Sequence, residues 1–204
     1  MGKENTACTQ GLWIWNKAVP VKTADGKTIN VIFVDTEGLG DVDKETNNDV
    51  RIFMFAMLIS SHLIYNCTGV IDGDMIQQIF SLVTKMSERI RLSNSEIHSH
   101  TDCVDPEEYK QYYPALTVLV RDFPFNLKDS NGNPISSNEY LQRVIADKPG
   151  MSLNIIKENL VKMTIRTSFP LLNCFVMSRP ADTEEDLIRL NEIPINQLKP
   201  LFQK

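Results

Sequence analysis

The chain of 204 residues is 42% hydrophobic and 23% charged, and its formal net charge at pH 7 is −5. These values are typical of a soluble α/β domain with a sizeable core, and they disfavour a nucleic-acid partner, which needs a basic face. A membrane span is excluded because no apolar run approaches roughly 18 residues, and four widely spaced cysteines with a polar first ten residues favour free thiols in the cytoplasm.

The first predicted element is an antiparallel hairpin. Apolar and aromatic residues dominate 11–19 and 29–34, and the Asp-Gly pair of "TADGKT" between them is a strong turn signal. The Gly-Lys-Thr at 26–28 matches the tail of a phosphate-binding loop, G-x-x-x-x-G-K-[ST]. However, Val21 stands where that motif needs glycine, and a strand rather than a helix follows. A hairpin turn is therefore the better interpretation.

Helices and strands alternate along the rest of the chain. In order, the pattern predicts a helix over 49–61, a strand over 62–69, a helix over 72–91, a polar loop over 93–105, a buried strand over 115–122, helices over 137–145 and 152–165, a strand over 173–178 and a capped acidic helix after residue 180. This alternation predicts an α/β fold with a mostly parallel sheet and an antiparallel hairpin near one side.

Polar residues follow three strands of the predicted sheet, where α/β proteins bind their ligands. These strand ends are Asp35-Thr36-Glu37-Gly38, Arg121-Asp122-Phe123 and Ser178-Arg179-Pro180. At the first of them, the Asp35 carboxylate could hold a hydrated Mg²⁺ through water, and Gly38 would let a backbone N–H approach a terminal phosphate. The DxxG pattern is weak by itself, and the alternative is that Asp35 caps a following helix.

Five segments of the chain carry a family resemblance. They are "TACTQGLWIW", "VIFVDTEGLGD", "LISSHLIYNCTGVI", "LVRDF" and "CFVMSRPADTEEDL". Their order and approximate spacing resemble those of the large GTPases called guanylate-binding proteins, over nearly the whole chain. The resemblance implies a Ras-like P-loop GTPase domain of the dynamin superfamily, with GTP as substrate, GTP and GDP as ligands and Mg²⁺ as cofactor.

The resemblance assigns four residues to the metal and the phosphates. Thr9 matches the switch-loop threonine that ligates Mg²⁺ and senses the γ-phosphate, and Asp35 matches the carboxylate that reaches Mg²⁺ through water. Gly38 matches the amide donor to the γ-phosphate. Glu37 matches an acidic residue of the catalytic water network.

The resemblance assigns Arg121 and Asp122 to the guanine base. An aspartate can accept both the ring N–H and the exocyclic amine of guanine, a pair of donors that adenine lacks, while Arg121 packs along the base or closes the pocket. The alternative is a structural ion pair between these two neighbours. The loop after 179–180 resembles the guanine cap, a lid that also takes part in nucleotide-dependent dimerisation.

The chain also departs from the family pattern. The family's phosphate-binding loop precedes the switch threonine by a few tens of residues, whereas eight residues precede Thr9 here. We therefore expect residues 1–204 to form a partial GTPase domain, from switch I through the guanine cap, without the first strand, the phosphate-binding loop or the helical stalk. Such a chain should hydrolyse GTP weakly or not at all, because phosphoryl transfer depends on positioning and charge neutralisation.

The alternative function is a catalytically inactive dimerisation or regulatory module, acting as a homo- or heterodimer through the cap face. Peripheral membrane association stays open for a full-length protein.

Overall fold

The computed structural model describes residues 11–36, 47–95, 110–200 and 202–203. The chain divides into two units, residues 1–60 and 61–204, and each is described by itself. Among the described helices, none combines the length and the apolar character needed to cross a membrane.

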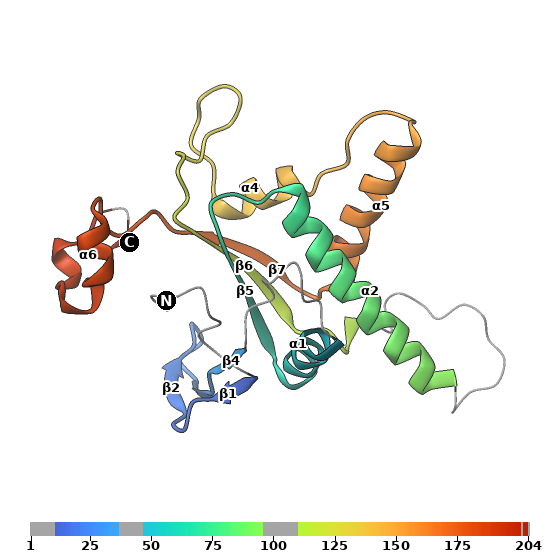
Figure 1. Ribbon diagram of the computed structural model, residues 1–204, viewed down its shortest axis with the longest axis horizontal. Helices are drawn as coiled ribbons and strands as arrows, with labels where there is room; N and C mark the ends of the chain where they lie inside the picture. Colours follow the sequence, from blue (N-terminus) through green and yellow to red (C-terminus); the bar gives the residue numbers. More distant parts are fainter. Residues whose placement is uncertain (1–10, 37–46, 96–109, 201, 204) are drawn as a thin grey trace. The chain divides into compact units, whose positions relative to one another are not determined.

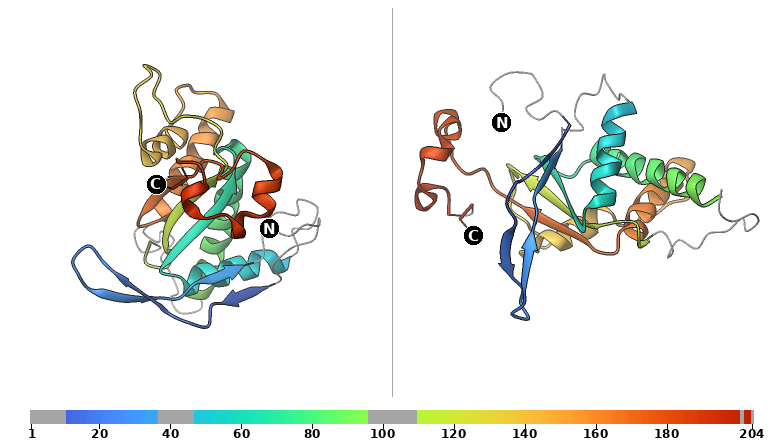
Figure 2. Two further views of the ribbon diagram at one scale, coloured as in Figure 1. Left: turned by 90° about the vertical axis from the view of Figure 1, so that its left-hand side faces the viewer. Right: turned by 90° about the horizontal axis from the view of Figure 1, so that it is seen from below.

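The first unit contains the predicted hairpin, now resolved into two antiparallel strand pairs. These are β1 (Leu12–Ile14) with β4 (Val34–Thr36), and β2 (Val19–Lys22) with β3 (Thr28–Val31). Figure 2 shows the pairs following one another along a single ribbon. Between them, residues 15–18 lie opposite residues 32–33, so one strand bulges where the register changes.

The turn of the hairpin confirms the interpretation of the Gly-Lys-Thr motif. The N–H of Thr23 donates to the carbonyl of Lys27 over 2.8 Å, and the N–H of Gly26 donates back to Thr23 over 2.9 Å. Gly26 has φ 81°, a left-handed conformation that glycine adopts without strain. These residues therefore close a hairpin and do not form a phosphate-binding loop. Helix α1 (Asn47–Ile59) follows later in the unit.

The second unit contains a parallel sheet with strand order β5-β6-β7 (Figure 1). Its strands are β5 (His62–Thr68), β6 (Ala115–Arg121) and β7 (Leu172–Val176), and its helices are α2 (Gly73–Ser95), α4 (Ser137–Val144), α5 (Leu153–Ser168) and α6 (Glu184–Ile188), followed by 3-10 turns at Leu190–Glu192 and Ile195–Gln197. The predicted α/β class, with a parallel sheet and antiparallel strand pairs, is confirmed.

The two faces of this sheet differ. On one face, Leu116, Val118 and Val120 are buried, α4 packs against β7, and α2 packs beside α5 (Figure 1). The alternate residues of the strands point the other way, and on that face Ile64 and Phe175 are 55% and 53% exposed. One face therefore holds the core of the unit, and the side chains of the other face are exposed to solvent.

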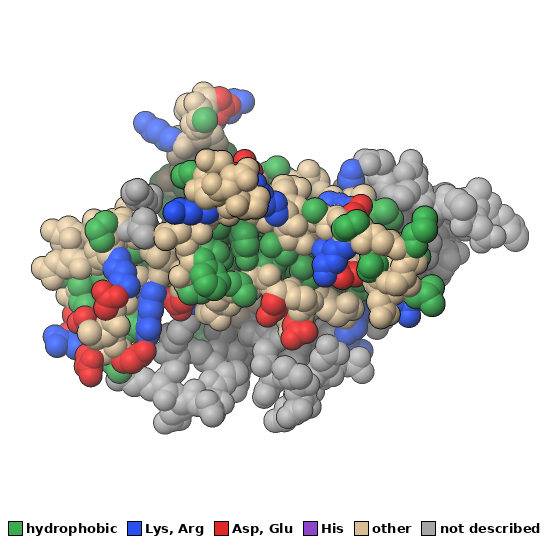
Figure 3. All heavy atoms as spheres, turned by 90° about the horizontal axis from the view of Figure 1, so that it is seen from above, with side chains coloured by type: hydrophobic (Ala, Val, Ile, Leu, Met, Phe, Trp, Pro, Cys, Tyr) green, Lys and Arg blue, Asp and Glu red, His purple; other side chains and the backbone are tan. Residues whose placement is uncertain are grey.

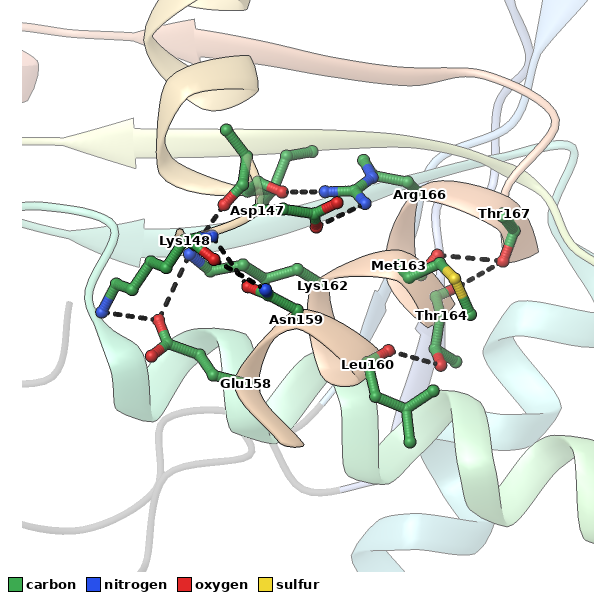
Figure 4. A network of polar contacts seen from close by, with 12 residues as sticks. Asp147, Lys148, Glu158, Asn159, Leu160, Lys162, Met163, Thr164, Arg166 and Thr167 are labelled. Carbon is green, nitrogen blue, oxygen red and sulfur yellow. Dashed lines mark hydrogen bonds and ion pairs between the residues drawn. The ribbon is translucent and has the colours of Figure 1, made fainter. Parts of the chain in front are cut away.

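A network of polar contacts fastens the loop between α4 and α5 onto α5 (Figure 4). Lys162 is 3% exposed, and its Nζ donates to the carbonyl of Ala146 over 3.0 Å and lies 3.2 Å from Oε1 of Glu158. The same carboxylate lies 2.7 Å from Nζ of Lys148, whose backbone N–H and C=O both bond to the Asn159 side chain. The buried ammonium thus has both an ionic and a neutral partner.

Candidate functional site

The polar end of β6 turns sharply at Asp122. This residue has φ 54° and is the one non-glycine residue with positive φ in the described ranges. The turn is held from both sides, because the N–H of Gly69 donates to the Arg121 carbonyl over 2.8 Å and the N–H of Phe123 donates to the Met177 carbonyl over 3.0 Å. Asp122 is therefore fixed at the carboxyl edge of the central strand, between the ends of β5 and β7.

The aromatic side chain of Phe123 anchors this turn in the core. Phe123 is buried, and its ring meets those of Tyr140 and Phe125 edge to face, with centroids 5.3 Å and 5.9 Å away. The hydroxyl of Tyr140 accepts from the N–H of Ile71 over 3.1 Å, which links α4 to the loop after β5. The neighbouring strand ends are thus held in one arrangement.

The carboxylate of Asp122 is exposed and, among the described residues, makes no hydrogen bond or ion pair. The guanidinium of Arg121 is directed elsewhere, because its Nε donates to Oδ1 of Asn66 on β5 over 2.7 Å. A structural ion pair between Arg121 and Asp122, the alternative interpretation of this sequence, is therefore wrong. The carboxylate is free to accept two hydrogen bonds from a ligand.

Asn66 was not singled out as a site residue from the sequence. The available signal was an asparagine inside an otherwise apolar strand, since strands are depleted of asparagine. Its partner could not be identified without the register, which places Asn66 opposite Leu119 and Thr68 opposite Arg121.

The segment after β7 folds as the predicted capped acidic helix. Thr183 caps α6 by accepting from the N–H of Asp186 over 3.1 Å, and Arg179 forms an ion pair with Glu184. Figure 3 shows acidic and basic side chains gathered on this segment at the left of the view. At its entrance, the buried Oγ of Ser178 has no hydrogen-bond partner in the described chain.

Asp35 lies in the first unit, on β4 and opposite Trp13 in the register of the strand pair. It is exposed, and because α1 begins at Asn47, Asp35 cannot be the cap of that helix. An exposed carboxylate at a strand end offers the hard oxygen donors that Mg²⁺ prefers, so the residue fits a magnesium ligand. Thr9, Glu37 and Gly38 lie outside the described residues, and their roles stay predictions.

Asp35 and Asp122 belong to different units. From the sequence, the two carboxylates are expected to face one crevice, Asp35 serving the cation and Asp122 the purine, and this expectation stays a prediction. Within the second unit, the structure does bring Arg121, Asp122 and Asn66 together at one sheet edge, beside the strand that leads to the cap-like segment.

Polar side chains gathered at the carboxyl edge of a parallel sheet are typical of α/β proteins, which bind their ligands at that edge. Comparison with protein families narrows this class. Residues 2–204 match the family "Guanylate-binding protein, N-terminal domain", and the chain belongs to this family.

Individual relatives agree with this assignment. The chain is 37% identical to guanylate-binding protein 7 of Mus musculus, over 96% of this chain and 30% of the relative. It is 33% identical to guanylate-binding protein 1 of Homo sapiens, over 99% of this chain and 33% of the relative. The chain thus spans about a third of the length of the curated relatives it matches.

Proposed function

We propose that this chain binds guanine nucleotides and that Asp122 reads the base. The observation that carries the proposal is an exposed carboxylate that has no hydrogen bond or ion pair among the described residues, on a turn whose backbone is held on both sides. A carboxylate in this state accepts from the ring N–H and the amine on one edge of guanine. Adenine presents no such pair of donors on that edge. The site would therefore discriminate against adenine, because the Asp122 carboxylate would make neither hydrogen bond with it.

The proposal extends to GTP hydrolysis by the guanylate-binding-protein type of large GTPase, within a partial, Ras-like GTPase domain over 1–204. Asp35 and Thr9 would hold Mg²⁺, the former through water, and the ion would supply charge neutralisation at the phosphates. Gly38 would donate its amide to the terminal phosphate, and Glu37 would organise water near it. The membership of the family and the exposure of Asp35 support this assignment.

We further propose that the 204-residue chain hydrolyses GTP slowly. The sequence contains no G-x-x-x-x-G-K-[ST] segment, so nothing in it supplies the lysine and the backbone cradle for the β- and γ-phosphates. In the family that this chain resembles, the phosphate-binding loop also carries an arginine finger, and such a finger is worth roughly 10³ to 10⁵ in rate in related chemistry. Turnover of GTP by the purified chain at about 1 s⁻¹ or faster would contradict this part of the proposal.

Calorimetric titration tests the proposed function. With Mg²⁺ present, GDP should bind the chain at least about tenfold more tightly than ADP, and Asp122→Ala should abolish the preference. Asp74→Ala is the matched control, because Asp74 is also an exposed aspartate of the second unit but lies in the first turn of α2. Equal affinities for GDP and ADP in the unmodified chain would refute base reading by Asp122.

The second candidate function is a catalytically inactive module that dimerises through the cap segment. Its support is the highly charged segment around α6. An ion pair between Lys199 and Asp182 and a hydrogen bond from the N–H of Lys199 to the carbonyl of Pro180 join the two ends of this segment. Size-exclusion chromatography of the chain mixed with a full-length relative should then show a complex at micromolar concentration. Separate elution of the two proteins would count against this function.

A further inference from the structure

The position of Asn66 within β5 needs a physical explanation. The side chain lies on the exposed face of the sheet, the face that also carries Arg121, and its strand neighbours on that face are Ile64 and Thr68. An asparagine costs β-propensity at an interior strand position, and a local choice that disagrees with its element is often found where function requires it.

The hydrogen bond from Arg121 supplies that explanation. The distance of 2.7 Å from Nε to Oδ1 is short, as expected when a charged donor meets a neutral amide oxygen. Arg121 is also the immediate neighbour of Asp122, whose carboxylate has no partner in the described chain. An arginine beside an exposed carboxylate can pair with it unless other acceptors hold the guanidinium, and the Asn66 side chain is one such acceptor for Arg121.

We propose that Asn66 is a positioning residue for guanine recognition. It accepts from Arg121 across β5 and so contributes to keeping the guanidinium away from the carboxylate of Asp122, which stays available to the base. This inference rests on the proposed function, and it adds that recognition depends on a side chain that does not itself touch the base.

The test is a double-mutant cycle on the 204-residue chain, with GDP as the probe in calorimetric titrations. Asn66→Ala should weaken GDP binding about tenfold, because a hydrogen bond to a charged group is lost. Asn66→Asp keeps an acceptor for Nε and should restore binding to within about twofold of the unmodified chain. In an Arg121→Ala background, Asn66→Ala should have almost no further effect, because Asn66 acts through Arg121.

Two controls separate positioning from general damage. Asn173→Ala removes another asparagine from the same face of the sheet, on β7, and should leave GDP affinity unchanged. The Arg121 Nε–H resonance of the ligand-free chain should shift on Asn66→Ala and not on Asn173→Ala. If Asn66→Ala fails to fold, the Asn66→Leu variant, whose side chain has a similar size and no acceptor, replaces it in the cycle.

The outcomes separate this inference from the proposed function. Absence of GDP binding by the unmodified chain would overturn the proposed function and the inference with it. Normal GDP binding that Asn66→Ala leaves unchanged, or losses that simply add in the double variant, would overturn the inference alone. Loss of affinity that Asn66→Asp rescues and that disappears in the Arg121→Ala background would establish it.

Discussion

Asp122 combines a proposed role in base recognition with an unusual backbone conformation. Its φ of 54° lies in the left-handed region, which aspartate tolerates better than most residues and which β-branched residues avoid. The strand end that precedes Asp122 marked it as a candidate ligand-binding residue, and the family resemblance assigned it to the guanine base, which stays a prediction. The conformation could not be predicted, because it depends on hydrogen bonds from Gly69 and to Met177, which lie far from Asp122 in the chain.

Substitutions at Asp122 should therefore separate stability from binding. Asp122→Gly should keep or slightly raise the free energy of unfolding, because glycine adopts positive φ without strain, while it removes guanine binding. Asp122→Val should lower that free energy by about 1–2 kcal/mol. Urea unfolding followed by circular dichroism measures both. A glycine variant less stable than the valine variant would contradict the account of the turn.

The two described cysteines provide a second test at the scale of single residues. Burial is the main cause that raises the pKa of Cys174 to about 12 and that also raises the pKa of Cys67. Because the thiolate is the reactive form, iodoacetamide at about pH 8 should label both thiols much more slowly in the folded chain than in guanidinium. Peptide mapping by mass spectrometry would measure this, and equal labelling rates would show that the thiols are not protected.

Among the elements, α4 begins with a complete capping box. The Ser136 hydroxyl accepts from the N–H of Glu139 over 3.1 Å, and the Glu139 carboxylate accepts from the N–H of Ser136 over 2.7 Å. These hydrogen bonds to Ser136 hold the pKa of Glu139 below its ordinary value of 4.5. The predicted helix over 137–145 agrees with the observed Ser137–Val144, whose start the capping box fixes.

The capping box predicts a pH dependence. Since the folded pKa of Glu139 is depressed, its contribution to stability is complete above the unfolded pKa of about 4.5 and is lost as the pH falls through the lower folded value. The protection factors of the amides in the first turn of α4, which correct for the intrinsic pH dependence of exchange, should therefore fall more steeply as the pH drops below about 4.5 than in Glu139→Gln. Parallel profiles for the two proteins would show that the carboxylate does not stabilise the helix.

The polar network on α5 makes a prediction about Lys162. Lys162→Ala should cost about 1–3 kcal/mol of unfolding free energy, because it leaves the Ala146 carbonyl and the Glu158 carboxylate without their buried partner. Lys162→Met fills the same space and should cost less. Thermal unfolding of both variants tests this. Equal losses would mean that the polar contacts, not volume, decide stability there, and a methionine variant as stable as the unmodified chain would contradict a stabilising role for those contacts.

The exact ends of the elements and the register between strands were not predicted from the sequence. The helix expected over 72–91 continues to Ser95, because its polar last turn carries no signal that separates helix from loop. The hairpin was predicted, but the bulge of residues 15–18 against 32–33 was not, since the register between the two strands is not read from either strand alone. Hydrophobic periodicity identifies elements better than it identifies register.

At the scale of the whole molecule, the family was identified from linked segments and is confirmed by the match over residues 2–204. The α/β class with its parallel sheet is confirmed as well. The contact between Asn66 and Arg121 was not predictable, because the pairing of parallel strands is set by tertiary packing and not by local pattern. Half of the site, at Arg121 and Asp122, now has a geometry, while the half at Thr9, Glu37 and Gly38 stays a prediction.

The most direct test of base reading by Asp122 is an exchange of specificity. Xanthine carries a carbonyl where guanine carries its exocyclic amine, so the amide side chain of an Asp122→Asn variant could donate to that carbonyl while accepting from the ring N–H. In calorimetric titrations, Asp122→Asn should bind xanthosine diphosphate at least about tenfold more tightly than GDP, and the unmodified chain should show the reverse order. If Asp122→Asn kept the unmodified chain's preference for GDP, Asp122 would not be the residue that reads the base.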